Sequence, residues 1–221
     1  MASETYNYSG LGMAMFSIIT IFFYIIKYFA KANWVDWGYY LMLALSQMLI
    51  NYNIHSKMCH ESNPDRASHK KWQTTMTNTL IPWILIFILL KLMLIIFPGW
   101  LSPFSNTFGY LVTTMFGVKD VLKNIFKQPG TESVDEFKAT INYIYSNPTL
   151  LINEITTDNF DDFIETMNRG GLLEKGSNNN QEYLKKLVGL KEIVAELIWT
   201  LLTGILTINI ATNQIINASC Q

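Results

Sequence analysis

Nitrogen and sulfur donors gather in one short stretch of the sequence, where their types invite a metal-binding hypothesis. His55, Cys59, His60 and His69 lie within fifteen residues, and imidazole nitrogen and thiolate sulfur are ligands that Zn²⁺ prefers. Their spacing matches no familiar zinc-ligand pair, and His55 is expected to belong to a helix. We therefore expect neither a metal nor a cofactor and interpret this stretch as a polar loop.

Three polar side chains recur every four residues just before this loop. Gln47, Asn51 and His55 fall on one face of a helix, because side chains four residues apart lie one above the other. In an apolar helix such a stripe hydrogen-bonds to a neighbouring helix, at about 0.6 kcal/mol per contact, or it lines a path for a substrate. We favour the first role because amides are typical of cross-helix bonding, and keep the second as an alternative.

Lys91 is the most costly residue of the chain, because it lies within the most apolar stretch, residues 80–97. A cation at the centre of a membrane helix costs about 2.5–3.5 kcal/mol on insertion scales. The long lysine stem can carry the ammonium group to the nearer membrane surface, which we favour. An ammonium group that stays inside is expected to pair with the stripe at Gln47, Asn51 and His55, and would indicate transport.

The rest of the sequence contains no recognisable catalytic motif. We find no phosphate loop, dinucleotide fingerprint, nucleophile elbow or zinc-protease helix. The acidic cluster of Asp158, Asp161, Asp162 and Glu165 lacks the residue order of a calcium loop, which favours a solvated helix face. Without a convergent nucleophile, base and oxyanion donor, the sequence predicts a protein that is not an enzyme and has no small-molecule substrate.

The elements that hold these residues are long uncharged windows. Half of the 221 residues are apolar and 15% are charged, whereas an average soluble chain carries about 25% charge. A bilayer core of about 30 Å needs about 20 apolar helical residues. Four windows qualify, and they predict an all-α, multi-pass membrane protein with about four transmembrane helices. These windows are about 10–26, 38–54, 80–97 and 197 onward.

Tryptophans and small residues are placed as expected for membrane helices. Trp34 and Trp37 precede the second window, Trp100 follows the third and Trp199 opens the last, and indole rings favour the headgroup level. Small residues that let helices approach closely share one face of the first and last windows. These packing residues are Gly10, Ala14, Ser17, Thr200, Thr203, Gly204 and Thr207. They predict a compact bundle or a contact with other membrane proteins.

A polar helical domain is predicted between the third and fourth windows. Residues 119–196 carry nine basic and thirteen acidic residues, and a helix from about residue 181 is expected to run on into the last window. Pro98, Gly99 and Pro103 break any continuous helix in 98–118. That uncharged segment is interpreted as interfacial or re-entrant, with a short extra span as the alternative. The predicted division is therefore a membrane region at 1–118, a polar domain at 119–196 and a final helix with the C-terminus at 197–221.

The chain carries two cysteines and nearly balanced charge. Four spans would bring Cys59 and Cys220 out on the same side of the membrane, so we hypothesise a disulfide bond between them. Sixteen basic residues against seventeen acidic ones exclude a strongly cationic protein. We therefore expect no nucleic-acid partner.

One block of the sequence carries a resemblance to a known group of proteins. The run LIPWILIFILLKLMLIIFPGWLSPFSNTFGYLV at 80–112, with NYNIHSKMC at 51–59 and LLINEI at 150–155 more loosely, resembles a membrane protein of nucleocytoplasmic large DNA viruses, the algal-virus and giant-virus group. PGWLSPFSNTFGY is its distinctive part, and the resemblance covers about half of the chain. It implies a component of the virion's internal membrane, a minor capsid protein that ties this membrane to the icosahedral shell.

The sequence therefore gives two competing expectations for function. The leading one is a structural membrane protein of a large DNA virus, with the lipid bilayer and viral capsid or minor capsid proteins as partners and residues 119–196 as the binding surface. The alternative is a small channel or transporter that uses Gln47, Asn51, His55 and Lys91. No catalytic residues belong to the blocks that carry the resemblance.

Overall fold

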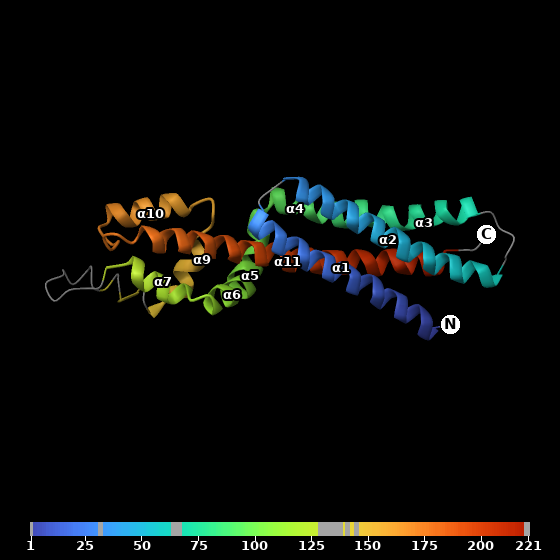
Figure 1. Ribbon diagram of the computed structural model, residues 1–221, viewed down its shortest axis with the longest axis horizontal. Coiled ribbons are helices and arrows are strands. Elements are labelled where there is room, and N and C mark those ends of the chain that lie inside the picture. The colour runs from blue at the N-terminus through green and yellow to red at the C-terminus, as the bar shows by residue number, and fades with distance from the viewer. Residues whose placement is uncertain are drawn as a thin grey trace. The chain divides into compact units, whose positions relative to one another are not determined.

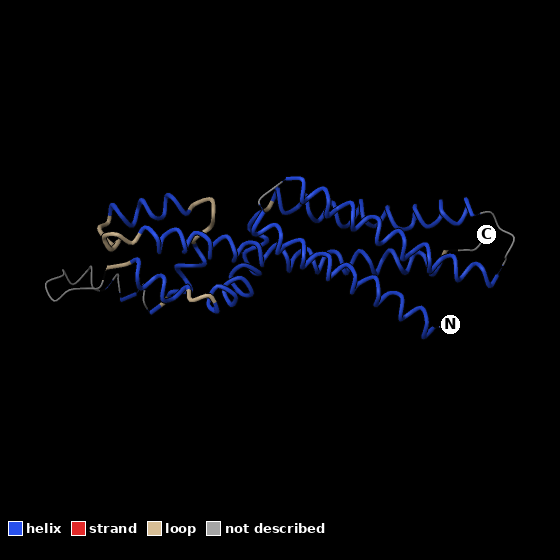
Figure 2. Tube along the Cα trace, in the orientation of Figure 1, coloured by secondary structure: helices blue, strands red, loops and turns tan. Residues whose placement is uncertain are grey.

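The structure is a computed structural model in which nearly every described residue is helical or in a short turn (Figure 2). It contains one isolated antiparallel bridge, between Phe126 and Leu173. The all-α prediction is therefore confirmed for this part of the chain. The described residues are 2–30, 33–62, 68–127, 139, 142–143 and 146–218, with side chains described except in 2–9, 33–34, 60–62 and 68–70.

Internal contacts divide the chain into two compact units. Met1–Pro98 and Leu197–Gln221 form one, which we call the bundle unit, and Gly99–Glu196 form the other, the inserted unit. The sequence-based division placed 98–118 with the membrane region, whereas the contacts group most of this segment with the residues that follow it. The long helix α11 (Asn178–Asn217) begins in the inserted unit and ends in the bundle unit without a break. The expected continuity of this helix is confirmed.

Long helices make up the bundle unit, because its sequence consists of apolar helix formers with few breakers. Neighbouring helices along the chain pack on one another, α1 on α2 and α2 on α3. The helices are α1 (Ala2–Ala30), α2 (Asn33–Ser62), a third made of α3 (Ser68–Pro82), the π-helical η1 (Trp83–Ile88) and α4 (Leu89–Ile96), and the end of α11 (Figure 1).

The third helix of the bundle unit continues through a proline. Pro82 lacks an N–H donor and crowds the carbonyl of the preceding turn, and the helix accommodates it with the wider π-helical turn η1 that follows. It ends at Phe97, which leaves the helical region at φ −126° and ψ 71° before Pro98. The helix begins at Ser68, before the predicted window at 80–97. Its first turns are polar, so a search for apolar windows does not detect them.

By length and composition, three helices among the described residues can cross a membrane. They are Gly10–Ala30 in α1, Lys71–Ile96 across α3 to α4, and α11. Helix α2 spans 30 residues, but polar residues such as Gln47 and Asn51 lower its average apolarity. The described residues thus contain three candidate membrane spans, which is consistent with a membrane protein, and the fourth span at 38–54 stays a prediction.

Short helices build the inserted unit. Gly117 separates α6 from α7 at φ 78°, a left-handed conformation that glycine adopts without steric cost. Pro148 opens α9, where its missing N–H donor costs nothing. The elements are η2 (Pro98–Leu101), α5 (Ser102–Phe104), η3 (Ser105–Gly109), α6 (Tyr110–Met115), α7 (Val118–Ile125), α9 (Pro148–Glu154), α10 (Phe160–Arg169) and the start of α11.

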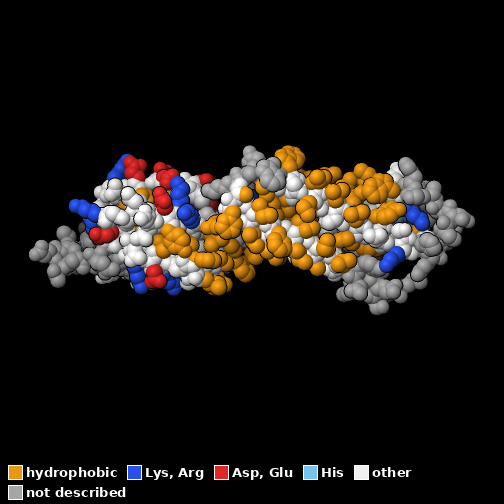
Figure 3. Space-filling view, in the orientation of Figure 1, with side chains coloured by type: hydrophobic (Ala, Val, Ile, Leu, Met, Phe, Trp, Pro, Cys, Tyr) orange, Lys and Arg blue, Asp and Glu red, His pale blue; other side chains and the backbone are white. Residues whose placement is uncertain are grey.

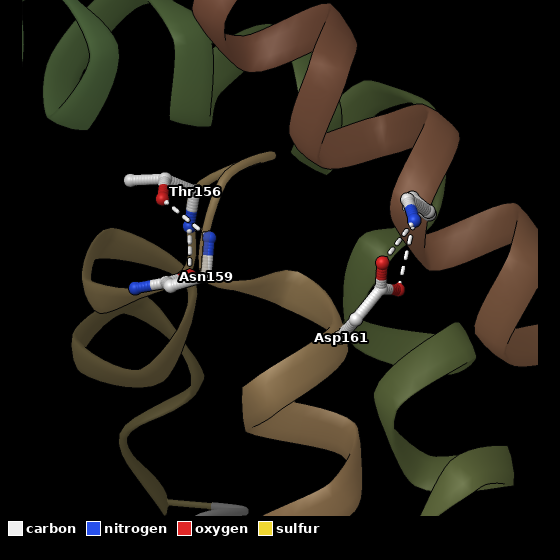
Figure 4. Close-up of polar contacts among 4 residues, drawn as sticks. Thr156, Asn159 and Asp161 are labelled. Atoms are coloured by element: carbon white, nitrogen blue, oxygen red, sulfur yellow. Dashed lines mark hydrogen bonds and ion pairs between the residues drawn. The ribbon is translucent and has the colours of Figure 1, made fainter.

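The N-cap of α10 is not the neighbouring Asp158, although aspartate is a residue type that often caps helices. The N-cap is Asn159, whose carbonyl accepts the amide of Phe163 at 2.9 Å. Figure 4 shows Asn159 and Thr156 bonded reciprocally: the Thr156 amide donates to Asn159 Oδ1 at 2.7 Å, and the Asn159 amide donates to Thr156 Oγ1 at 3.2 Å. This pair fixes the turn before the helix and shifts the cap by one residue.

Apolar side chains from four helical segments form the core of the inserted unit. Helices α7, α9, α10 and α11 each contribute buried residues, as expected for a domain that folds in water. The larger members are Val118, Leu122, Ile125, Phe126, Ile152, Ile155, Phe160, Leu184, Leu187 and Val188.

Candidate functional site

The interior of the bundle unit is rich in polar side chains, and its outer faces are apolar. Exposed Leu41, Leu45 and Leu49 line the outside of α2, and apolar side chains dominate the visible face of this unit (Figure 3). This arrangement reverses the usual rule for proteins in water and is typical of helices surrounded by lipid. The buried polar residues of the bundle unit are Thr20, Gln47, Asn51, His55, Thr75, Thr79, Thr200, Thr203, Thr207 and Thr212.

The polar stripe of α2 makes hydrogen bonds to the helices beside it. Asn51 Nδ2 donates to Thr79 Oγ1 at 2.9 Å, and His55 Nδ1 lies 3.3 Å from Thr75 Oγ1. Gln47 Nε2 donates to the carbonyl of Gly12 in α1 at 3.3 Å. These contacts support the helix-contact role for the stripe. Sequence reasoning missed Thr75 and Thr79, although their spacing of four matches that of Asn51 and His55 in antiparallel order.

The hydrogen bonds of Thr75 assign the proton of His55. Thr75 Oγ1 donates to the carbonyl of Lys71 at 2.8 Å, so its oxygen is left to accept the proton on His55 Nδ1. The opposite ring nitrogen, Nε2, is then a bare acceptor. His55 Nε2 and Asn51 Oδ1 are both buried without a hydrogen-bond partner among the described residues. Two such acceptors suit a small donor such as water.

Lys91 has a partner that differs from the expected one. Its Nζ donates to Tyr24 Oη at 3.2 Å, and Tyr24 Oη lies 2.8 Å from Thr200 Oγ1. The chain of contacts joins α4, α1 and α11, whereas the sequence pointed to the α2 stripe as the partner of a buried Lys91. Tyr24 was missed because a hydropathy window counts tyrosine as part of an apolar run. Lys27 approaches the same ring, with its Nζ 5.5 Å from the ring centroid.

The predicted small-residue face of α11 is buried. Thr200, Thr203 and Thr207 are all buried, and Gly204 lies directly beneath the ring of Phe16. A Cβ atom added at Gly204 would overlap this ring. The missing side chain therefore allows the close approach of α1 and α11.

The predicted small-residue face of α1, in contrast, is largely exposed. Gly10 and Ala14 are exposed and Ser17 is half-buried, whereas Gly12, Phe16 and Thr20 are buried. Within this chain, α1 therefore packs through a face that includes a large ring, and the expected Gly10–Ala14–Ser17 contact is wrong. A large residue opposite Gly204 fills the space that two small faces would leave. Contact of Gly10 and Ala14 with another membrane protein stays a prediction.

The interfacial and cysteine residues are only partly described. Trp37 and Trp100 are exposed and Trp199 is half-buried, and the side chain of Trp34 lies outside the described residues. Cys59 is buried and is not a free thiol. Cys220 lies outside the described residues, so the pairing of these two cysteines stays a prediction. The side chains of His60 and His69 also lie outside them, and the described residues hold no group of three His, Cys, Asp or Glu side chains suited to a metal ion.

Among the described residues of the inserted unit, Lys191 is a charged side chain that is buried. Its Nζ donates to the carbonyls of Ile152 at 2.6 Å and Ile155 at 2.8 Å, which closes the end of α9. Removal from water lowers the pKa of Lys191 below its ordinary value. Sequence reasoning missed this role. The sequence does contain a sign that Lys191 is buried, because its position continues the helix face of the buried Leu184, Leu187 and Val188.

The other charged side chains described in the inserted unit are exposed or half-buried. Lys185 Nζ lies 2.8 Å from Asp161 Oδ1, and Figure 4 shows Asp161 at the start of α10. Glu165 pairs with Arg169 on the same helix. Charged side chains of both signs gather over this unit in Figure 3. Two members of the acidic cluster, Asp161 and Glu165, therefore take part in surface ion pairs.

Comparisons with known proteins give no relative of this chain. No family model matches it, and no curated protein or solved structure matches it.

Proposed function

We propose that the chain is a structural multi-pass membrane component of a large DNA virus particle, which anchors the capsid shell to the internal membrane as a minor capsid protein. The observation that carries the anchoring role is the reversal of polarity between the two units. The bundle unit exposes Leu41, Leu45 and Leu49 while burying Asn51 and His55, as membrane helices do. The inserted unit buries an apolar core contributed by α7, α9, α10 and α11 and exposes charged side chains such as Asp161 and Lys185.

The proposal includes α2 as a fourth membrane helix. Its 30 residues are about 45 Å long at 1.5 Å per residue, more than a bilayer core requires. The polar residues that lower its apolarity point inward and are hydrogen-bonded to α1 and α3. With four spans, residues 55–79 and the inserted unit lie on opposite sides of the membrane.

The virion assignment is supported by the resemblance of 80–112 to the large-DNA-virus membrane protein. The capsid-binding part is supported by the inserted unit, which has its own core and a surface of mixed charge. A surface of this kind suits polar contacts with coat proteins. Lipid on one side and shell proteins on the other are therefore the proposed partners.

Crosslinking mass spectrometry on purified virus particles tests this function. An amine-reactive crosslinker is expected to join Lys123, Lys127, Lys185 or Lys186 of the inserted unit to a shell protein. Lys57 and Lys71 serve as matched controls, because the four-span topology puts them on the other side of the membrane. Intact particles without any crosslink from the inserted unit to the shell would contradict the proposal.

A second candidate function, a small channel or transporter, is favoured by one observation. Asn51 and His55 each carry a buried acceptor atom without a partner among the described residues, as a path for protons or small donors would require. Gln47 and Lys91 complete the proposed set. Flux through reconstituted protein that disappears in Lys91→Met, while assembly stays normal, would support this function against anchoring.

A further inference from the structure

An apolar groove runs between α2 and the third helix of the bundle unit. Its volume is about 450 Å³, and its walls consist largely of aromatic and branched aliphatic side chains. Its polar members are few, and Gln47, Thr79 and Lys91 are among them. A groove with apolar walls and few polar groups is typical of a ligand site.

The groove extends along the helices. Trp37, Lys91 and Ile95 line one end, and Gln47 and Thr79 line the other. Twelve residues separate Thr79 from Lys91, which corresponds to about 18 Å of helix. The hydrocarbon core is about 30 Å thick, so an acyl chain that starts beside Lys91 follows the part of this length that lies in its own leaflet.

The end of the groove at Lys91 carries positive charge. The ammonium group of Lys91 lines this end and donates to Tyr24 Oη. The Nζ of Lys27 lies 5.5 Å from the centroid of the Tyr24 ring, so a second cation lies near the same tyrosine. Trp37 lies exposed at this end, as indole rings do at the headgroup level. An anionic headgroup fits these two cations.

The walls of the groove disfavour another helix as its occupant. A bulky side chain packs on a helix where a small residue faces it, as Gly204 faces Phe16 in this unit, and a helix in this groove would need small residues opposite Trp83, Phe87 and Ile88 at once. Ala44 and Thr79 are its small members. A flexible acyl chain follows such an uneven surface better than a rigid helix does.

We propose that this groove binds an anionic phospholipid, with one acyl chain between α2 and the third helix and the phosphate beside Lys91. The proposal rests on the membrane embedding of α2 and the bundle unit, and it is independent of the virion assignment. The bound lipid would fill the groove and neutralise the charge that Lys91 places in the membrane.

Electron paramagnetic resonance of spin-labelled lipids tests the proposal on the full chain. The protein is reconstituted in phosphatidylcholine vesicles that contain a minority of phosphatidylglycerol, and the immobilised fraction is measured for each labelled lipid. The wild type is expected to prefer phosphatidylglycerol. Lys91→Met is expected to lower this preference about fivefold, the factor for one basic side chain at an anionic lipid. Lys71→Met, the charge-matched control near the start of the same helix, is expected to leave it unchanged.

A second pair of variants tests the groove itself. Ala44→Phe fills the groove and is expected to release the selected lipid, whereas Leu45→Phe, on the neighbouring outer face, is expected to retain it. Should Lys91→Met fail to insert, Lys91→Arg keeps the charge and must keep the preference, and Ala44→Phe must still lose it.

Three results would overturn the proposal. They are equal immobilisation of both lipids by the wild type, a preference that survives both Lys91→Met and Ala44→Phe, and a change of oligomeric mass in Ala44→Phe without loss of lipid. The last result would assign the groove to a second copy of the chain. Because the vesicles contain no capsid protein, failure here is distinguishable from the absence of crosslinks to the shell.

Discussion

The two units of this molecule use the same secondary structure with opposite polarity. Helix α11 shows both patterns within one element. In its first part, Leu184 and Leu187 are buried and Lys185 is exposed; in its last part, Thr200 and Thr207 are buried, and Leu202 and Leu206 are exposed. The helix is continuous from Asn178 to Asn217. What changes along it is the type of side chain that is exposed, which suits water in the first part and lipid in the last.

This difference explains which forces stabilise each unit. In water, burying an apolar side chain such as Leu or Val contributes about 1.5–3 kcal/mol, and the inserted unit is built on that term. In lipid this term vanishes between helices, so packing and inter-helix hydrogen bonds remain. The contact of Phe16 with Gly204 and the bond of Asn51 to Thr79 are examples in the bundle unit.

The largest expected effect comes from a charge placed in the core of the inserted unit. Leu122 is 1% exposed, and Leu122→Asp is expected to lower the free energy of unfolding by about 4 kcal/mol or more, because the carboxylate loses its water without gaining a partner. Hydrogen exchange of residues 118–125 in the full chain measures this loss. Leu150→Asp is the matched control at a 51% exposed site. Unchanged exchange in Leu122→Asp would show that no such core exists.

The next effect distinguishes lipid from water at an exposed leucine. Leu45 is 56% exposed on α2, and Leu45→Lys is expected to cost about 3 kcal/mol of membrane insertion. The inserted fraction after translation into microsomes measures it. Leu150→Lys, on the inserted unit, is expected to insert like the wild type. Equal insertion of both variants would place the outer face of α2 in water and contradict the difference in polarity between the two units.

A smaller effect is expected from Lys191, the buried cation of the inserted unit. Lys191→Met leaves the carbonyls of Ile152 and Ile155 without their donor, which is expected to cost about 2 kcal/mol. Lys185→Met removes an exposed pair with Asp161 and is expected to cost less than about 1 kcal/mol. Hydrogen exchange of residues 148–155 ranks the two variants, and the reverse order would contradict the capping role.

Lys191 also gives the inserted unit a pH dependence. Because burial lowers the pKa of Lys191 below 10.5, the folded state binds fewer protons than the unfolded state between the two pKa values. The wild-type free energy of unfolding is therefore expected to rise as the pH increases toward 10.5, and to lose this increment as the pH falls through the folded pKa. If the free energy of unfolding of Lys191→Met rises with pH in the same way, the pH dependence belongs to another group.

The smallest effect concerns the polar stripe of the bundle unit. Asn51→Leu is expected to cost about 0.6 kcal/mol, the mean for hydrogen bonds between membrane helices. A double-mutant cycle with Thr79→Val, read from unfolding in mixed detergent micelles, isolates the pair. A coupling above about 2 kcal/mol would show that the stripe does more than join α2 to α3.

The sequence predicts the helices better than their faces. Long apolar runs indicate the helical class, and the absence of proline between Asn178 and Asn217 indicates that α11 is continuous. Windows of average hydropathy do not tell which side of a helix is covered. For this reason the packing face of α1 was assigned to Gly10 and Ala14, whereas Gly12 and Phe16 are buried.

The candidate site was predicted only in part, because its partners come from distant segments. Gln47, Asn51 and His55 follow from helical periodicity alone. The partners of Asn51 and Lys91, Thr79 and Tyr24, depend on how the helices pack, which local patterns do not specify. Lys191 was missed for the same reason, since the carbonyls that bind it lie on α9.

Photolabelling from within the bilayer tests the central claim most directly. A carbene probe confined to the hydrocarbon core is activated in vesicles that contain the full chain, and the labelled residues are identified by mass spectrometry. The account predicts labels on the outer face of α2, at Leu41, Leu45 and Leu49, and none within residues 119–190. Labels in that part of the inserted unit, or an unlabelled α2, would contradict it.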